Sequence, residues 1–494
     1  MFYIGIDSGT QSTKSVVLDF ETGEIVAQAS QAYELISGLP PGHLEQHPAD
    51  WIAAVKNSIA SCLEQLGDRR SEVRGIGVSG QQHGLVVLDE NDEVVRPAKL
   101  WCDTSTVDQC EQFASQFGGT EGLIAKAGNT MLPGYTIPKL LWLKQNEPDQ
   151  FAKVRSVLLP HDYINFVLTG VKRMEYGDAS GMGILNVRTR EWDQDLIQFV
   201  DSRVADMLPE LGSSNEIHGT LLPDLASDWG LSDDLIISAG GGDNMMGAIG
   251  TGNISNGTIT ASFGTSGTLY GCAEKPIIDP NGEIAAFCDS TDHWLPLACT
   301  MNVTVVTEQV RSWFGWDHDE LEKQVGSVPV GADGVSFLPY LNGERTPNLP
   351  NGSGVIHGLG GSSASPAHLA RAAMEGATLG LAYGLQRFDA LGLTPGEIRL
   401  TGGGSKSPIW RQISADAFGV PVVGLATAEG AGLGGAIQAA HVDGKGSYEE
   451  LCGRFVALDD ATRCEPDAEA SAIYRDKLER QTKLTGVLKE AGML

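Results

Sequence analysis

The chain is poor in basic residues. Lysine and arginine together number 34 among 494 residues, against 63 aspartates and glutamates, so the formal net charge is −29. A surface field of that sign repels phosphate backbones and anionic lipids, which excludes the usual electrostatic route to nucleic acids and membrane surfaces. We therefore expect small-molecule partners, with no nucleic acid and no membrane.

Other absences further restrict the class of protein to which this chain can belong. The eight cysteines include no C-x-x-C pair and no regular spacing, which excludes a disulfide framework or a zinc ribbon and predicts reduced thiols in a cytoplasmic protein. No apolar run approaches ~18 residues and the chain opens on an apolar strand, so we expect neither a membrane span nor a signal peptide. The motif G-x-x-x-x-G-K-[ST] does not occur, which excludes a P-loop.

Glycine, in contrast, is abundant, with 62 residues clustered at turns rather than in a repeat. A length of 494 residues exceeds one ordinary core, so two large domains are expected. An amphipathic helix over residues 51–66 is followed by a buried strand over 73–80 that runs into a polar loop. Alternation of this kind predicts an α/β fold whose ligands gather beyond the strand ends.

Two glycine–threonine turns carry the strongest signal. Residues 4–14 and 258–272 each read as an apolar strand, a tight turn rich in Gly, Ser and Thr, and a returning strand. Such turns point backbone N–H groups and hydroxyls into one small concavity that suits a phosphate. A matched pair predicts two clamps on one polyphosphate and its metal ion, and the expected phosphate contacts are Thr10, Gln11, Gly264, Thr265 and Ser266.

One carboxylate comes directly before the first of these turns. Asp7 ends the strand that leads into it. A carboxylate in that place can hold a water of a hydrated Mg²⁺ ion. The alternative is an aspartate that caps its own turn.

A second carboxylate follows the strand at residues 235–242. Three consecutive glycines leave room for a ligand beside the strand end, and Asp243 and Asn244 come next, before a helix expected from Met245 onward. A carboxylate held over a crevice at a strand end is placed to accept a hydroxyl proton as the oxygen attacks a phosphorus atom. The alternative is that Asp243 is the N-cap of the following helix.

Polar and planar groups end two further strands, where Gln82, His83, Trp101 and Asp103 lie. Amides, an imidazole, an indole face and a carboxylate are what a polyhydroxylated ligand needs, so these four are predicted substrate contacts. The alternative for a lone loop histidine is simple solvation. The loop at residues 342–347 reads equally as an ion-paired loop or as a substrate lid.

Two later segments are predicted to pack closely. A helix over residues 366–391, N-capped by Ser365, carries three glycines at a spacing of four, namely Gly376, Gly380 and Gly384. Residues 430–435 fit the pattern G-x-G-x-x-G, but dinucleotide folds place that pattern in the first βα turn. Close helix packing is therefore the favoured interpretation of both segments.

These motifs resemble the sugar-kinase/Hsp70/actin superfamily and, more narrowly, the FGGY carbohydrate kinases. The residues that carry the resemblance are 7–10, 264–267 and 401–405 for the superfamily, and 134–146 with 354–359 and 368–375 for the two FGGY signatures. The resemblance implies an α/β fold of two ribonuclease H-like domains that flank a catalytic cleft. It also implies ATP and Mg²⁺ as cofactors.

The same resemblance implies how the chain is divided. An N-terminal FGGY domain over residues 1–248 is expected to hold the sugar and the first phosphate turn. A nucleotide-binding C-terminal FGGY domain is expected over 249–442, beyond a hinge within 245–257. Residues 443–494 are expected to form a C-terminal helical segment, with a helix over 467–489. Dimers are common in this family, so a homodimer is among the expected partners.

Within the family the chain is most similar to the xylulokinase subgroup, which implies ATP-dependent phosphorylation of D-xylulose to D-xylulose 5-phosphate. Carried over residue by residue, Asp243 is the catalytic base and Asp7 serves Mg²⁺, while Asn244, Gln82 and His83 bind the sugar. The residues implied to border the adenosine are Gly403, Gly404 and Ser407.

Two departures leave the sugar open. Gln82 stands where bacterial members more often have methionine, and Cys102 stands where asparagine is usual. A kinase for ribulose, gluconate or fuculose is therefore the first alternative. A nucleotide switch of the Hsp70 or actin type and a non-catalytic sugar sensor are the others. A sensor would be expected to lose Asp7 or Asp243, and the chain has both.

Overall fold

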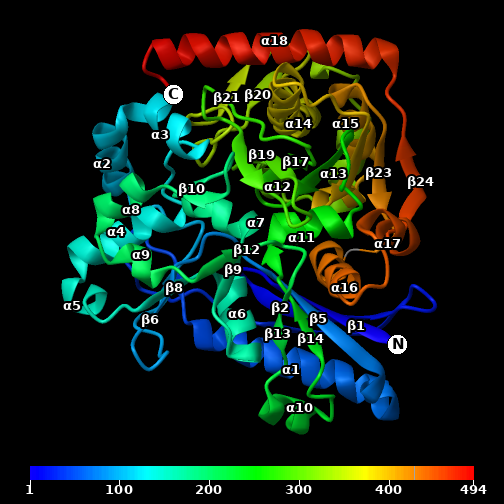
Figure 1. Cartoon of the computed structure of the whole chain (residues 1–494). Coiled ribbons are helices and arrows are strands. Elements are labelled where there is room, and N and C mark those ends of the chain that lie inside the picture. Colours follow the sequence, from blue (N-terminus) through cyan, green and yellow to red (C-terminus); the bar gives the residue numbers. More distant parts are fainter. Residues whose placement is uncertain (428) are drawn as a thin grey trace.

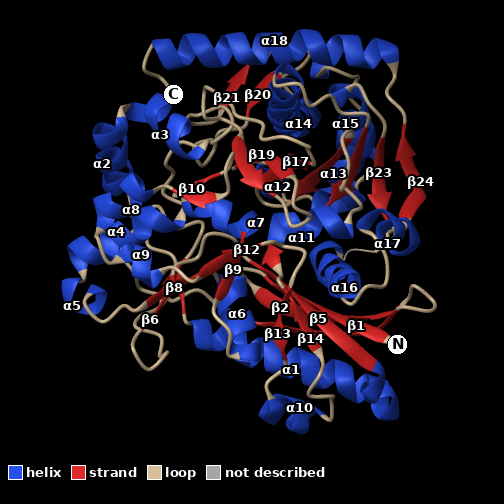
Figure 2. Ribbon diagram, viewed as in Figure 1, coloured by secondary structure: helices blue, strands red, loops and turns tan. Residues whose placement is uncertain are grey.

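The computed structural model describes residues 1–427 and 429–494. It contains two mixed seven-stranded sheets, each covered by helices (Figure 1, Figure 2). Within these residues, no helix combines the length and the apolar composition needed to cross a lipid bilayer.

The first sheet comprises β1 (Phe2–Ser8), β2 (Ser12–Asp19), β3 (Ile25–Ala32), β5 (Val73–Gly80), β13 (Ile217–Thr220), β14 (Ile236–Ser238) and β15 (Gly241–Gly242). Its order is β13-β14-β5-β1-β2-β3, and β15 extends the pairing along β5. β1 and β2 form an antiparallel hairpin in which Asp7 lies opposite Lys14, while β5 runs parallel to β1. The hairpin and the strand at 73–80 predicted from the sequence are confirmed.

The second sheet comprises β16 (Thr258–Phe263), β17 (Gly267–Gly271), β18 (Ala285–Cys288), β19 (Trp294–Thr300), β22 (Glu397–Thr401), β23 (Val422–Leu425) and β24 (Leu458–Cys464). It repeats the scheme of the first sheet, because β16 and β17 form a hairpin and β22 runs parallel to β16. The two related α/β halves expected of the ribonuclease H-like fold are therefore confirmed.

The first half carries a large helical insertion between β5 and β13, on the left of Figure 1. Its helices are α2 (Val107–Phe117), α3 (Gly119–Ala127), α4 (Thr136–Asn146), α5 (Pro148–Phe151), α6 (Pro160–Thr169), α7 (Tyr176–Ala179), α8 (Gln194–Val200) and α9 (Val204–Met207). Short strand pairs join them, namely β4 (Glu45–Gln46) with β7 (Ala98–Lys99), β6 (Val86–Leu88) with β8 (Ser156–Leu158), β9 (Arg173–Glu175) with β12 (Glu210–Gly212), and β10 (Leu185–Asn186) with β11 (Glu191–Trp192). Apolar residues of the insertion, such as Phe113, Ile137 and Leu143, share one core with α11 (Asp243–Gly250) and with β17, β18 and β19 of the second sheet.

Two helices lie between the sheets, α11 (Asp243–Gly250) and α16 (Gly430–Val442) (Figure 1). α16 packs on β1, β5 and α11, and the contact is made by main chain. A Cβ added at Gly5 would lie 1.7 Å from the oxygen of Gly432, and one at Gly77 would lie 2.0 Å from the oxygen of Gly435. The prediction that residues 430–435 pack closely is confirmed.

Outer helices complete the layers: α1 (Pro48–Leu66) and α10 (Pro223–Trp229) in the first half, and α12 (Thr304–Phe314), α13 (His318–Gly326), α14 (Pro366–Ala390) and α15 (Pro408–Phe418) in the second, beside β20 (Ser336–Leu338) and β21 (Val355–His357). Ser365 caps α14 as predicted, accepting from the N–H of His368. The packing prediction holds for Gly376, where a Cβ would lie 2.0 Å from the oxygen of Phe337. The prediction is wrong for Gly380. A Cβ added there would meet no atom within 4 Å, and the residue lines a small cavity under α18 (Ala468–Glu490).

The C-terminal segment is not helical throughout. α17 (Tyr448–Phe455) and α18 flank β24, which pairs antiparallel with β23 at the edge of the second sheet. β24 was missed because it is an edge strand with partly exposed, charged residues, so it shows no apolar pattern. The final helix is confirmed, with Asp467 as its N-cap.

Candidate active site

Asp243 lies at the first residue of α11, between the two sheets (Figure 1). β14 ends at Ser238, Gly240 adopts a left-handed φ of 75°, and β15 brings the chain back along β5 before α11 begins. The N-cap position is taken by Gly242, and the Asp243 carboxylate accepts from the N–H of Asn244 at 2.9 Å. The alternative in which Asp243 is the N-cap is therefore wrong.

The glycines before Asp243 make room for protein atoms. A Cβ at Gly242 would lie 2.6 Å from Cγ of Gln82, and one at Gly241 would lie 2.3 Å from Oγ of Ser290. The expectation that this space serves a ligand directly is corrected: it admits the Gln82 side chain to the position beside Asp243.

The surroundings of the Asp243 carboxyl disfavour its ionised form. Burial, followed by the charges of Asp7 and Asp178, raises its pKa to about 7. The group thus changes charge near neutral pH, where a base that accepts a proton and later returns it is most effective. Because the repulsion comes partly from Asp7, the predicted base and the predicted Mg²⁺ carboxylate lie within electrostatic range of each other.

Asn244 connects this centre to both halves of the molecule. Its Nδ2 donates to Oε1 of Gln82 (2.7 Å) and to Oδ1 of Asp243 (3.0 Å). Its Oδ1 accepts from Oγ1 of Thr268 at 3.2 Å, in β17 of the second sheet. Asp243, Asn244 and Gln82, which the sequence predicted as base and sugar contacts, therefore form one hydrogen-bonded group, and Thr268 joins it.

Asp7 ends β1 beside the first turn, residues 8–12. Its Oδ1 accepts from Oγ of Ser79 at 3.1 Å in the neighbouring strand β5. Burial raises the pKa of this carboxyl, and the Ser79 hydrogen bond and the nearby Lys14 partly offset the rise. The turn itself closes by a main-chain bond from Gly9 N to Ser12 O (3.0 Å), so the alternative that Asp7 caps the turn has no support.

The first turn is held by a polar network. Oγ1 of Thr10 accepts from Nε1 of Trp101 at 2.9 Å and donates to Oε1 of Gln81 at 3.3 Å. The Thr10 carbonyl accepts from Nε2 of Gln46 at 2.7 Å, while Gln11 is exposed. Trp101, predicted as a substrate contact, thus lies against a predicted phosphate contact.

The second turn, residues 263–267, is braced from two sides. The carbonyls of Gly264 and Thr265 accept from the N–H groups of Thr304 and Val303, each at 3.0 Å. On the other side Gly402, with φ 83°, packs so closely that a Cβ would lie 2.7 Å from the main chain of Phe263. The glycine turn after β22 is therefore placed beside this phosphate turn.

The residues predicted to contact adenosine differ in whether they have open space or polar groups available for a ligand. Gly403 has open space where a side chain would be, while Gly404 is packed against Phe263 and Trp410. The hydroxyl of Ser407 caps α15 by accepting from the N–H of Trp410 at 3.0 Å, and it donates to Glu322 at 2.6 Å. Its structural role is therefore evident, and any adenosine contact would be additional.

His83 and Gln82 present polar atoms that lack partners. Among the described residues, Nε2 of Gln82 and Nδ1 of His83 are buried side-chain atoms without a hydrogen bond. Burial, Lys139 and Arg345 together hold the pKa of His83 well below its usual range, so the imidazole is neutral. Buried polar atoms are nearly always hydrogen-bonded, so Nε2 of Gln82 is a candidate contact for a polar ligand, whereas Nδ1 of His83 lies on the edge of the ring that faces Gly181.

Asp103 is the one predicted substrate contact that the structure removes from the site. It is fully buried, and its oxygens accept from Lys99 (3.1 Å), from the N–H of Leu44 (2.9 Å) and from the N–H and hydroxyl of Ser105 (2.9 and 2.5 Å). All its acceptor capacity is used, so the prediction is corrected: Asp103 anchors its own loop.

Two groups of potential metal ligands lie away from Asp243. His43, Glu45 and Asp103 surround the ammonium of Lys99, which already supplies the positive charge between them. Cys272, Asp289 and His293 meet at the β18–β19 turn, where Asp289 accepts from Thr291, His293 and Cys272. Both groups are explained by internal hydrogen bonds.

In the described part of the chain, Glu344 and Arg345 of the loop at 342–347 do not form an ion pair with each other, so the ion-paired form has no support, while the substrate lid stays a prediction. Glu344 is buried and accepts from the N–H of Met301 (2.6 Å) and from Nδ2 of Asn302 (3.0 Å). Arg345 instead extends toward the first half, with its guanidinium 5.9 Å from the ring of Trp101. The loop thus bridges the second phosphate turn and the predicted sugar contacts.

Two site residues were missed from the sequence: Gln46 and Lys139. Gln46 lies in a two-residue strand, which gives no periodic signal. Lys139 did give a signal in the sequence, because it is a charged residue inside the apolar helix α4. A buried lysine in such a helix requires polar partners, and that requirement could have marked it.

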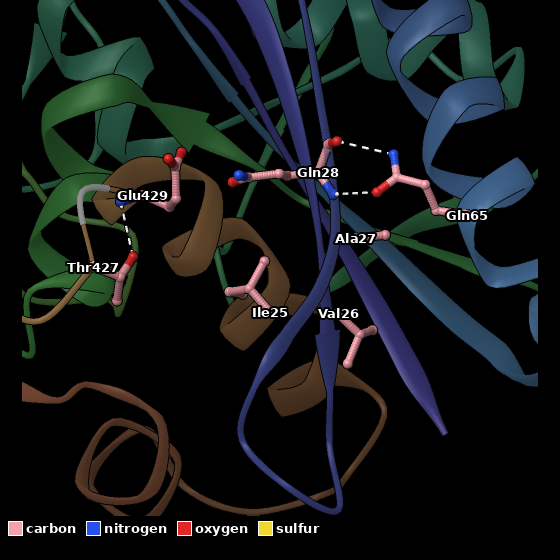
Figure 3. Close-up of a pocket in the computed structure, with 7 residues that line it drawn as sticks. All are labelled: Ile25, Val26, Ala27, Gln28, Gln65, Thr427 and Glu429. Carbon is pink, nitrogen blue, oxygen red and sulfur yellow. Dashed lines mark hydrogen bonds between the residues drawn. The ribbon is translucent and has the colours of Figure 1, made fainter.

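A recess of about 490 Å³ lies elsewhere, between β3 and the start of α16 (Figure 3). Its lining includes Gln28 and Gln65, which hydrogen-bond to each other across the strand–helix contact, and Glu429. Glu429 also pairs with Lys14 at 2.9 Å. The recess contains none of the predicted sugar or base residues.

Known proteins show the same arrangement over almost the whole chain. Residues 2–250 match the N-terminal domain of the FGGY family of carbohydrate kinases, and residues 259–442 match its C-terminal domain. A xylulose kinase of Haemophilus influenzae is 43% identical over 484 residues, which cover 97% of this chain and 98% of that protein.

Solved structures agree with the sequence matches. A ligand-bound xylulose kinase from Lactobacillus acidophilus superposes with a TM-score of 0.93 at 27% identity, covering 99% of this chain and 98% of that one. A gluconate kinase from the same organism superposes with a TM-score of 0.92, also at 27% identity and with the same coverage. The chain therefore belongs to the FGGY family of carbohydrate kinases.

Proposed function

We propose that this chain transfers the γ-phosphoryl group of ATP to the terminal hydroxyl of D-xylulose, giving D-xylulose 5-phosphate. The observation that carries the proposal is the group of Asp243, Asn244, Gln82 and His83, which joins a carboxylate of pKa about 7 to two buried polar atoms without partners. The relatives named xylulose kinase support the choice of sugar.

In the proposed reaction, Asp243 accepts the proton of the attacking hydroxyl as its oxygen approaches the γ-phosphorus in line. Gln82, through Nε2, and the imidazole of His83 orient the sugar by hydrogen bonds to its hydroxyls, and the Trp101 ring gives an apolar wall. Closure of the two halves around the bound substrates excludes water and limits loss of ATP to hydrolysis.

The residues beside Asp243 fit a divalent cation. Asp7 and Asp243 repel each other, and a hard cation between or beside two carboxylates relieves such repulsion. We propose that Asp7 holds Mg²⁺ through its carboxylate. When bound, the ion would neutralise charge on the phosphates of ATP.

The nucleotide is proposed to lie against the second half. Thr10 and Gln11 of the first turn and Gly264 and Thr265 of the second would contact the phosphates through N–H groups and hydroxyls. Gly403 and Gly404 would border the adenosine, with Ser407 next to them. The boundaries 1–248, 249–442 and 443–494, with a hinge within 245–257, stay predictions, as does a homodimer.

A cytoplasmic location is part of the same proposal. The eight cysteines, all in the described part of the chain, are free thiols, which suits a reducing compartment. ATP, the proposed phosphoryl donor, is also supplied there.

Gluconate is the second candidate substrate, and Arg345 is the observation that favours it. Its guanidinium lies near His83 and Trp101, where a cation could pair with the carboxylate of a sugar acid. The gluconate kinase structure of the same fold points to the same class. D-xylulose stays the first candidate because of the named relatives.

The test is ATP consumption with Mg²⁺ across D-xylulose, D-ribulose, L-ribulose, L-xylulose, L-fuculose, glycerol and gluconate, with a blank that contains no sugar. We expect kcat/KM for D-xylulose to exceed every other value by at least about tenfold. A preference for gluconate would transfer the proposal to the sugar-acid candidate. Rates equal to the blank throughout would contradict both.

The base is tested by Asp243→Ala. Removing it should lower kcat by about 10³-fold or more, because the attacking hydroxyl loses its proton acceptor. Sugar binding measured by calorimetry should change by less than about fivefold, since Gln82 and His83 are still in place. Asp228→Ala, an exposed aspartate on α10, is the control. A kcat within tenfold of wild type would show that Asp243 is not the base.

A further inference from the structure

His83 has an unusual main-chain conformation for a residue with a side chain. Its φ is 63°, in the left-handed region that residues other than glycine seldom occupy. Such a conformation is strained and persists only where the surroundings enforce it. At His83 it is enforced by hydrogen bonds to its carbonyl and by packing of its ring.

The carbonyl of His83 is held by two donors from α4. Nζ of Lys139 donates to it at 2.7 Å, and Oγ1 of Thr136 donates to it at 3.1 Å. Nζ of Lys139 also donates to the carbonyl of Gly134 at 2.7 Å. One ammonium therefore ties the His83 loop to the chain that enters α4.

A buried lysine is an energetically costly residue for holding main-chain carbonyls. It is fully buried, and in the described part of the chain the hydrogen-bond acceptors of its ammonium are both main-chain carbonyls. Burying an ammonium without a bonded carboxylate is costly. A methionine or leucine would pack in α4 without that cost, so the packing of α4 does not explain the lysine.

The ring of His83 is positioned as closely as its main chain. It packs edge-on to Tyr135, with ring centroids 5.2 Å apart, and against Phe287 at 5.5 Å. On its third side Gly181 leaves a niche, because a Cβ there would lie 2.0 Å from Cε1 of the ring. A shift of the main chain would drive the ring out of this niche.

We propose that Lys139 is a positioning residue of the sugar site: its ammonium, with the hydroxyl of Thr136, locks His83 in the left-handed conformation that turns the imidazole toward the sugar. Lys139 does not touch the sugar or the nucleotide. The inference rests on the proposed function only in naming a sugar as the ligand of His83. It deepens that proposal by assigning the specificity of the site partly to α4.

The test is Lys139→Met, which keeps the length of the side chain and removes its donors. We expect KM for the sugar to rise about 10- to 100-fold, while KM for ATP and the ATPase rate without sugar stay within threefold of wild type. A crystal structure of the variant should show His83 outside the left-handed region and its ring displaced from Gly181.

The matched control is Lys477→Met. Lys477 is also a buried lysine that donates to a main-chain carbonyl, that of Gly331, but it pairs in addition with the buried Glu375 and lies in α18 away from His83. We expect it to lower thermal stability without a selective change in KM for the sugar. If Lys139→Met does not fold, Thr136→Val, which removes one donor at nearly constant volume, should still raise the sugar KM about 3- to 10-fold.

Two results would overturn the proposal: sugar and ATP KM values that rise equally, or a variant structure in which His83 keeps its conformation. Failure of the proposed function looks different, because then the wild type itself would transfer phosphate to none of the sugars. In that case the crystal structure of Lys139→Met alone decides whether Lys139 positions His83.

Discussion

At the scale of single residues, the active centre depends on carboxylates that repel each other. Asp243 is raised in pKa by burial and by Asp7 and Asp178, and Asp178 in turn pairs with His161 at 2.9 Å. The proposed base is thus an ordinary aspartate whose pKa is raised to about 7 by burial and by neighbouring carboxylates. The pH profile of the enzyme should therefore depend on those neighbouring carboxylates.

The pH prediction follows from the sign of the shift. The base acts when ionised, so kcat/KM for the sugar should fall as pH decreases through about 7, the pKa of Asp243. Asp178→Asn removes a negative charge while keeping a hydrogen-bond acceptor for His161, so the acid limb should move to lower pH by about 0.5 unit. The measurement is kcat/KM against pH for both proteins. An acid limb that stays in place, or moves to higher pH, would show that Asp178 does not tune the base.

At the scale of elements, glycines decide how closely helices approach strands. In α16 they let a helix lie directly on the main chain of β1 and β5, where any side chain would push the two halves apart. In α14 the same residue type occurs at a spacing of four, yet only some positions are in contact. Spacing alone therefore does not identify a packed glycine.

Two substitutions in α14 separate these cases. Gly376→Ala should lower the free energy of unfolding by about 1–3 kcal/mol, because its Cβ would lie 2.0 Å from the Phe337 carbonyl oxygen. At Gly380 there is open space for a Cβ, so Gly380→Ala should raise the free energy of unfolding by about 1 kcal/mol through helix propensity. Urea unfolding of both variants is the measurement. Equal signs for the two would contradict the packing described for this helix.

At the scale of the whole molecule, the balance of charge sets the response to the medium. A net charge of −29 on 494 residues means that the folded chain repels itself at neutral pH. The active centre works against this field, because it must bring an anionic nucleotide to Asp7 and Asp243. Local dipoles at the two phosphate turns and a cation at Asp7 are the means proposed here.

A salt dependence follows from that charge. The melting temperature at pH 7.5 should rise by several degrees between about 20 mM and 500 mM KCl, because the added salt shortens the Debye length from about 20 Å to about 4 Å and so screens the repulsion. At pH 5, close to the isoelectric point of about 4.6, the same increase in KCl should have much less effect. A melting temperature that is independent of KCl at pH 7.5 would argue against self-repulsion as a destabilising term.

By itself, the sequence determined the fold class, both phosphate turns, the strand leading to Asp243 and the group of Gln82, His83 and Asn244 as candidates. These features are local: a turn, a cap or an apolar period depends on neighbours a few residues away. The tertiary structure decided which candidates meet. It placed Thr268 beside Asn244, removed Asp103 into an interior network, and assigned Lys139 to the His83 carbonyl.

The physical reason is that hydrogen-bond partners and charge neighbours in this site come from segments far apart along the chain. Asn244 bonds to Gln82 across 162 positions, and Trp101 bonds to Thr10 across 91. The pKa of Asp243 depends on burial and on two distant carboxylates, none of which a pattern of neighbouring residues encodes. The residues of the site were therefore readable from the sequence, while their protonation, partners and roles were set by packing.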